Sequence, residues 1–138
     1  MPGSYLIDVP RGIVFSRGWG VVTDEEILAH ARALRDDPRF ERGFRQLIDF
    51  RDIDRFAVTS AGVQHIAQRN PFRLDARRAF VVAQDEVFGM LRMYWSYAEA
   101  DPNEFRVFMA MEPALEWIGL DPKEPWPATQ PDAFFGAG

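Results

Sequence analysis

Residues 78–83 have the sequence Arg-Ala-Phe-Val-Val-Ala, a short segment that is almost continuously apolar. A strand with apolar side chains at successive positions has to be covered on both faces, as the strands of parallel sheets usually are. Helical patterns precede and follow this segment in the chain, and they begin near Ser60 and at Asp85. The segment therefore predicts an α/β protein in which helices cover a buried sheet.

Strand and helix patterns alternate along the rest of the chain. Residues 5–9 and 12–16 predict an antiparallel hairpin with a turn at Pro10-Arg11-Gly12. Further strands are expected at residues 46–50 and 105–109. Helical patterns extend from Thr23 to Pro38, from Thr59 or Ser60 to Arg69, from Asp85 to Glu99 and from Glu112 to Ile118. The order ββαβαβαβα predicts a single-layer mixed β-sheet, with an N-terminal antiparallel hairpin and then mostly parallel strands, packed with about four helices.

Two helix starts have recognisable caps. Thr23 is followed three residues later by Glu26, the spacing of a capping box, in which each side chain bonds a free backbone amide of the other residue. Asp85 is expected to cap the third helix. Between the strand at 46–50 and the second helix, residues 52–56 are expected to form a loop.

The composition narrows the classes of function. The chain has 138 residues, no cysteine and a formal net charge of −5. The lack of cysteine excludes disulfides, thiolate metal sites and cysteine nucleophiles, and the negative charge argues against nucleic acid or an anionic membrane as a partner. No apolar run approaches the roughly 18 residues of a membrane helix, and no signal peptide is visible, so we expect no membrane insertion and a cytoplasmic location.

Residues for catalysis or metal binding are few. His30 and His65 lie on different predicted helices, and neither has a second ligand at a metal-binding spacing. Each is expected to be a surface or partly buried side chain. No glycine-rich phosphate loop follows a strand. We therefore expect no catalytic residue, no metal site, no cofactor and no enzymatic activity.

Charged residues gather after the central predicted strand. Asp49, Arg51 and Asp52 follow one another there, and Ser60 begins the next helix. Ligands of open α/β sheets bind beyond the carboxyl ends of strands, and a helix N-terminus favours an anion. These four residues therefore form a possible ligand or anion site; the alternative is a solvated rim of charges.

The third predicted helix has more apolar residues than one buried face needs. Aromatic residues make up 14% of the chain, and 12 of them are Phe. Methionine and aromatic side chains are common at adaptable interfaces. The helix and the preceding strand therefore predict an apolar interface or pocket formed by Phe80, Phe88, Met90, Met93, Tyr94, Trp95 and Tyr97. The alternative is an ordinary core.

The composition changes again near Asp121, where prolines become frequent. Residues 1–120 are expected to form one domain, and residues 121–138 a Pro-rich aromatic tail. Trp126, Phe134 and Phe135 in this tail are candidates to cover the third helix, either in the same molecule or in a second copy.

The element order and several segments resemble the SpoIIAA-like family of STAS/SEC14-type domains, which many bacteria contain. The resemblance spans residues 4–119. It rests on residues 18–23, 46–51, 77–82, 87–94, 105–108, 112 and 114–119, including Gln46-Leu47-Ile48-Asp49-Phe50-Arg51 and Ala114-Leu115-Glu116-Trp117-Ile118-Gly119.

This resemblance implies a regulatory or binding domain. In the branch of anti-sigma-factor antagonists, a serine at the start of the helix after the central strand is phosphorylated, and the added charge controls partner binding. Ser60 or Thr59 matches this position, although Val58 stands where that branch usually has an acidic residue. A capping role for these hydroxyls is the competing interpretation.

Two functions therefore remain open from the sequence. The first is a non-enzymatic regulatory or protein-interaction domain, forming a homodimer through the third helix or the tail. The second, implied by the SEC14-type side of the resemblance, is a carrier or sensor of a small apolar, lipid-like ligand. Its cavity is expected between the sheet and the third helix, lined by Phe80, Phe88, Tyr94 and Trp95.

Overall fold

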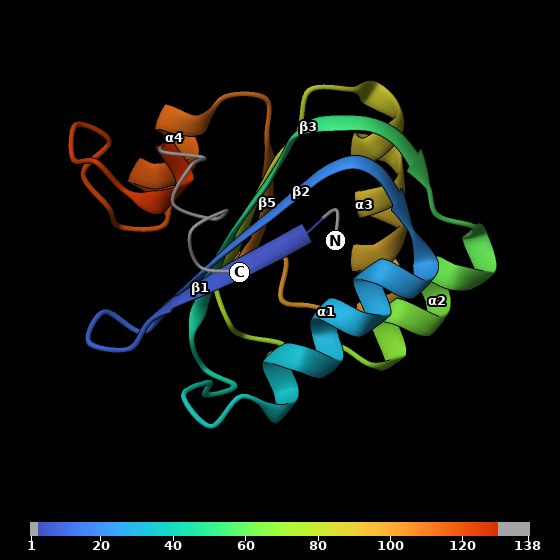
Figure 1. The fold of residues 1–138 in the computed structure, drawn as a ribbon, viewed down its shortest axis with the longest axis horizontal. Helices are drawn as coiled ribbons and strands as arrows, with labels where there is room; N and C mark the ends of the chain where they lie inside the picture. The colour runs from blue at the N-terminus through green and yellow to red at the C-terminus, as the bar shows by residue number, and fades with distance from the viewer. Residues whose placement is uncertain (1–2, 130–138) are drawn as a thin grey trace.

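The structure is a computed structural model that describes residues 3–129. Its strands form one five-stranded sheet in the order of the chain, β1-β2-β3-β4-β5 (Figure 1). β1 pairs with β2 antiparallel, and all other neighbours are parallel. The strand bounds are β1 Gly3–Asp8, β2 Ile13–Thr23, β3 Arg45–Ala57, β4 Arg78–Val81 and β5 Phe105–Phe108. The expected mixed sheet is therefore confirmed.

Helices cover both faces of the sheet. α1 (Asp24–Asp36), α2 (Ser60–Gln68) and α3 (Asp85–Ala98) connect the parallel strands, and α4 (Met111–Trp117) follows β5. Because the strand order follows the chain, each right-handed crossover advances in the same direction and places its helix on the same face. α4 lies on the opposite face (Figure 1).

The short strand β4 shows why both faces need cover. All four of its residues are buried. Phe80 packs into the core cluster that contains residues of α2 and α3, whereas Ala79 and Val81 pack into the cluster around α4. Successive side chains of a strand point to opposite faces, so one apolar segment contributes to two cores, as its composition predicts.

β2 and β3 are longer than the sequence suggests. β2 continues through Gly18 and Gly20 to Thr23, and β3 continues through residues 52–56 to Ala57. The loop expected at residues 52–56 is wrong, because this segment pairs with the end of β2 across two register shifts. The hydrogen bonds of this ladder come from a distant segment, which the local pattern does not show.

The helix starts agree with the predicted caps in part. Thr23 caps α1 by accepting a hydrogen bond from the Glu26 amide at 3.4 Å. The Glu26 side chain does not complete a capping box, since its buried Oε2 has no hydrogen-bond partner within residues 3–129. The expected cap at Asp85 is also wrong: Gln84 is the cap of α3, and Asp85 is the first helical residue. At this position the negative charge of Asp85 interacts favourably with the positive N-terminal end of the helix dipole.

Part of the C-terminal segment belongs to the core on the α4 face. Trp126 is buried, and its ring stacks on Phe15 with centroids 6.3 Å apart. Its Nε1 donates to the carbonyl of Asp121 at 2.6 Å. One interpretation of the sequence expected Trp126 to cover α3. In the structure it packs on the α4 face instead. Phe134 and Phe135 lie outside the described residues.

Asp24 and Thr59 link the first turns of α1 and α2. Asp24 accepts hydrogen bonds from the amide and the hydroxyl of Thr59, at 3.0 and 2.9 Å, and Thr59 in turn caps α2 by accepting from the Gly62 amide at 2.9 Å. A Cβ on Gly62 would collide with the Asp24 carboxylate. The glycine is therefore needed for close approach.

We expect Gly62→Ala to lower the free energy of unfolding by about 1–3 kcal/mol, because the Asp24 carboxylate must move and lose its bonds to Thr59. Gly89→Ala in α3 is the matched control, since a Cβ there meets no atom within 4 Å. It should leave stability unchanged or raise it by up to about 1 kcal/mol through helix propensity. Urea denaturation of both variants measures the difference, and equal effects would contradict the close-contact explanation.

Candidate functional site

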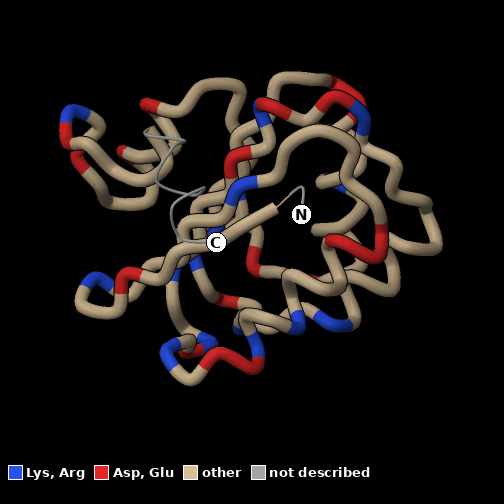
Figure 2. The backbone as a smooth tube through the Cα atoms, viewed as in Figure 1, with Lys and Arg blue, Asp and Glu red and all other residues tan. Residues whose placement is uncertain are grey.

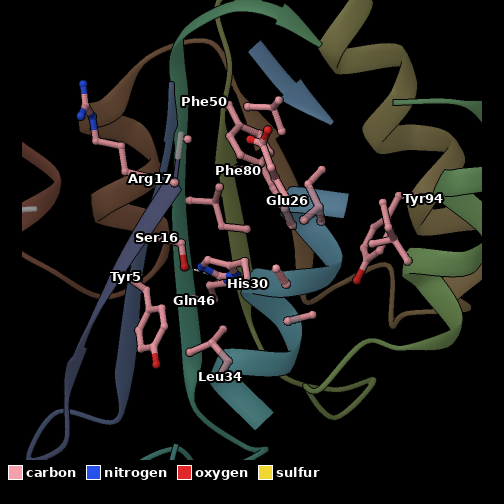
Figure 3. Close-up of a pocket in the computed structure, with 18 of the residues that line it drawn as sticks. Tyr5, Ser16, Arg17, Glu26, His30, Leu34, Gln46, Phe50, Phe80 and Tyr94 are labelled. Carbon is pink, nitrogen blue, oxygen red and sulfur yellow. Dashed lines mark hydrogen bonds between the residues drawn. The ribbon is translucent and has the colours of Figure 1, made fainter. Parts of the chain in front are cut away.

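A cavity of about 960 Å³ lies on the face of the sheet that α1, α2 and α3 cover (Figure 3). Strands β1, β2 and β3 and the start of β4 form its floor, α1 forms its roof, and α2 and α3 contribute to its wall. Leu34 is the buried residue of α1. Ile27 and Leu28 pack at the edge of the core cluster, and Tyr5 of β1 contacts the His30 ring. Several other side chains of the helix underside line the cavity.

Most of the cavity wall is apolar. The strands contribute large side chains, and all three covering helices add aliphatic ones. The lining includes Ile27, Ile48, Phe50, Val63, Phe80 and Leu91. Small-molecule sites in proteins have this character, with a largely hydrophobic lining and a few polar groups at defined places.

A row of three buried polar residues crosses the floor. Ser16, Gln46 and Arg78 lie on β2, β3 and β4, with exposed fractions of only 4%, 1% and 7%. Gln46 Nε2 donates to Ser16 Oγ at 3.1 Å, and Arg78 Nε donates to Gln46 Oε1 at 2.8 Å. Gln46 and Arg78 are direct partners in the sheet. The polar floor is therefore a hydrogen-bonded chain across three strands.

Arg78 is the charged member of this row. Most basic and acidic residues of the molecule lie in loops and at helix ends (Figure 2), and a cation in the interior needs partners. Arg78 Nη1 donates to Tyr94 Oη at 2.8 Å and to Asn70 Oδ1 at 3.3 Å. The guanidinium also lies 4.6 Å from the ring centroid of Phe72. Neutral oxygens and aromatic faces therefore hold this charge.

The ion pairs found within residues 3–129 do not include Arg78. Arg17, a basic residue of β2, does have a carboxylate partner. Arg17 points to the other face of the sheet (Figure 3), where its Nη2 lies 2.6 Å from Asp52. Arg78 is thus a buried positive charge that lines the cavity without a carboxylate beside it.

The roof has two polar groups of its own. Glu26 and His30 lie one helical turn apart on α1, and both line the cavity. Glu26 Oε2 and His30 Nε2 are buried, and neither has a hydrogen-bond partner among the described residues. Burial, and secondarily the positive charge of Arg78, lowers the pKa of His30 to about 4. The imidazole is therefore neutral near pH 7.

The structure places the residues of the predicted apolar interface or pocket in different surroundings. Phe80, Met90 and Tyr94 line the cavity, whereas Phe88 and Met93 pack at the edge of the core. Trp95 and Tyr97 are 36% and 47% exposed. The cavity lies mainly under α1 rather than under α3, because α3 packs against α2 and the sheet. Phe88 and Trp95, expected to line a cavity, do not line this one.

The charged residues of β3 are held by one another and by β2. Arg51 makes two side-chain hydrogen bonds to the buried Asp49, both 3.0 Å long, and Asp52 pairs with Arg17. They lie within the strand rather than at its end, because β3 continues to Ala57. At about 3.3 Å per residue, Ala57 is roughly 16 Å beyond Asp52. Ser60 follows Ala57, so it is not gathered with them.

Thr59 and Ser60 differ in their surroundings. Thr59 is the cap of α2, so the capping interpretation is confirmed for this residue. Its hydroxyl also donates to Asp24. Ser60 is the first helical residue, and its side chain is exposed. Phosphorylation at either position stays a prediction.

Sequence reasoning missed the polar floor and the place of His30. The strand sequences did indicate the polar floor. Gln46 lies two residues before Ile48, and Arg78 lies two residues before Phe80, so each points to the same face of the sheet as an apolar residue that faces the covering helices. A polar residue at an inward position indicates either a buried network or a site. Which of these it is depends on the space above it, and the strand sequences do not contain that information.

Neither the models of known protein families nor the sequences of curated proteins match this chain. Among solved structures, the chain is similar to an uncharacterised protein of the DUF3478 family with a SpoIIAA-like fold, from Shewanella loihica PV-4. The two are 17% identical with a TM-score of 0.51, over 77% of this chain and 83% of the other. The likeness confirms a SpoIIAA-like fold.

Two further findings concern the described part of the chain. Residues 3–129 contain no group of three or more His, Asp or Glu side chains placed to hold a metal ion. Within the same residues, no helix combines the length and apolar composition that a bilayer span requires.

The neutral His30 predicts a pH dependence of stability. Its pKa in the folded chain, about 4, is below the ordinary 6.5, so the unfolded chain takes up this proton first as the pH falls. The stability that the neutral imidazole contributes is complete above about pH 6.5 and is lost as the pH falls towards 4. The loss reaches about 2–3 kcal/mol by about pH 4.5. Denaturation curves of wild type and His30→Phe should show the variant losing less stability between neutral and acid pH.

His65→Gln is the control for this comparison, since His65 is exposed on α2. Its loss of stability on acidification should equal that of the wild type. A His30→Phe variant that loses as much stability as the wild type would show that the buried imidazole is not responsible.

Proposed function

We propose that this protein binds a small, mainly apolar ligand in the cavity under α1, as a carrier or sensor rather than as an enzyme. The observation that carries the proposal is the cavity itself. Protein interiors are close-packed, with few voids larger than a water molecule. The space of about 960 Å³ under α1 is partly open to solvent, and it has the size of small-molecule sites, about 300–1,000 Å³.

The amphipathic pattern of α1 supports this function. Ile27 and Ala31 lie one turn apart and both line the cavity, and neither is fully buried. An apolar helix face normally packs on a core. A ligand in the cavity would add contacts to these side chains, and it would stabilise the folded chain by mass action.

The protein-interaction role expected from the sequence has less support. α3 buries Val87, Leu91 and Tyr94, and it leaves Trp95 and Tyr97 exposed. The Trp95 indole nitrogen already donates to the carbonyl of Ala100 at 3.0 Å. The cavity is therefore the stronger basis for a function, and association of two copies stays a prediction.

A neutral fluorescent probe such as Nile red tests whether the cavity accepts apolar molecules. We expect its fluorescence to rise on binding to the wild type. Ala31→Phe places a ring in the cavity and should weaken binding about tenfold or more, because the probe and the ring compete for the same space. The folded variant should be no less stable, since the ring fills a void.

Gln64→Phe is the matched control, because it adds the same ring at an exposed position of α2 outside the cavity. Its affinity for the probe should equal that of the wild type. Equal binding by Ala31→Phe, or no binding by the wild type, would contradict a ligand site under α1.

A further inference from the structure

We propose that the ligand is an anionic amphiphile, a carboxylate on an apolar body, and that Arg78 binds its head group. The inference rests on the proposed function of the cavity and specifies the chemistry of its ligand. It follows from the position of Arg78, which is 7% exposed, lines a mainly apolar cavity and has no carboxylate partner among the described residues.

The hydrogen bonds of Arg78 leave one nitrogen for a ligand. Nε donates to Gln46, and Nη1 donates to Tyr94 and Asn70. Nη2 has no hydrogen bond to the described residues, and it is not one of the enclosed atoms without a partner. It therefore keeps accessible surface, and its two N–H groups can be donated to an oxygen of a head group. A charged acceptor makes the stronger bond with a guanidinium.

The neighbours of Arg78 orient it for this task. Gln46 and Tyr94 hold the guanidinium from the sheet and from α3, and Phe72 lies against its face. A planar guanidinium fixed in this way loses little freedom when it binds an anion. The guanidinium is thus held in place before a ligand binds, and no carboxylate of the described residues occupies the position of the anion.

The other charges of the cavity limit where the head group lies. Glu26 lines the roof with a buried oxygen, and its carboxylate would repel an anion there. His30 is neutral near pH 7 and adds no positive charge.

Arg17 and Arg39 also line the cavity, but each is paired with an aspartate, Asp52 and Asp37. One cation without a carboxylate partner among the described residues, under an acidic roof, favours a monoanion over a doubly charged phosphate. A carboxylate head beside Arg78, with its chain along Phe80 and Leu91, satisfies both the polar and the apolar parts of the cavity.

The test compares ligands that share one alkyl chain and differ in the head group. Dodecanoate, dodecanol and dodecyltrimethylammonium are titrated into the wild type below their micelle concentrations, near neutral pH, and binding is followed by calorimetry. Dodecanoate should bind at least about tenfold more tightly than dodecanol, as a charge-assisted hydrogen bond implies, and the cation should bind most weakly.

Arg78→Met should reduce the preference for dodecanoate over dodecanol to about twofold or less, while the affinity for dodecanol changes little. Arg32→Met is the matched control: it removes the same charge from an exposed position of α1 outside the cavity, and it should keep the preference. If Arg78→Met does not fold, Arg78→Gln is measured in its place, because its amide can still bond to the neighbouring Gln46.

The outcomes separate the two proposals. If none of the three compounds binds to the wild type, the proposed function itself fails. If dodecanol binds as tightly as dodecanoate, or if the Arg78 variants keep the preference, the cavity is a ligand site but the anionic head group is wrong. A preference that disappears with Arg78 alone supports the inference.

Discussion

The parallel pairing of β2 with β3 is the constraint on which the rest of the structure depends. The ladder extends from Ile13 opposite Arg45 to Thr23 opposite Ala57, the last residues of both strands. It therefore brings the first turns of α1 and α2 together, where Asp24 accepts two hydrogen bonds from Thr59. α1 then returns over the sheet from this fixed point. The cavity is the space that remains between the helix and the long strands.

The second determining feature is the buried charge in the floor of that space. A guanidinium removed from water is costly unless it is bonded and paired. Gln46, Asn70 and Tyr94 supply neutral acceptors for Arg78. Such acceptors satisfy the N–H groups of Nε and Nη1 without neutralising the charge, so the positive potential extends over the cavity and acts on His30. A core that needed only stability would gain little from this arrangement, whereas the proposed binding site would use it.

The strand and helix order was predictable because it depends on local signals. Thr23 and Thr59 cap their helices as short-range hydrogen bonding requires, and residues 78–82 of the apolar segment are buried. The extension of β3 through residues 52–56 was not predictable, because its hydrogen bonds come from β2. For the same reason Asp49 and Asp52 were expected at a strand end, and they lie inside the strand.

By itself the sequence determined a mixed α/β sheet of the SpoIIAA-like kind, since periodicity, caps and burial on two faces are properties of neighbouring residues. It also contained each polar residue of the candidate site. Only the tertiary structure decided that Ser16, Gln46 and Arg78 form one row, that His30 and Glu26 face it from α1, and that a cavity separates them. The physical reason is that these residues meet only after three strands have paired and a helix has crossed them.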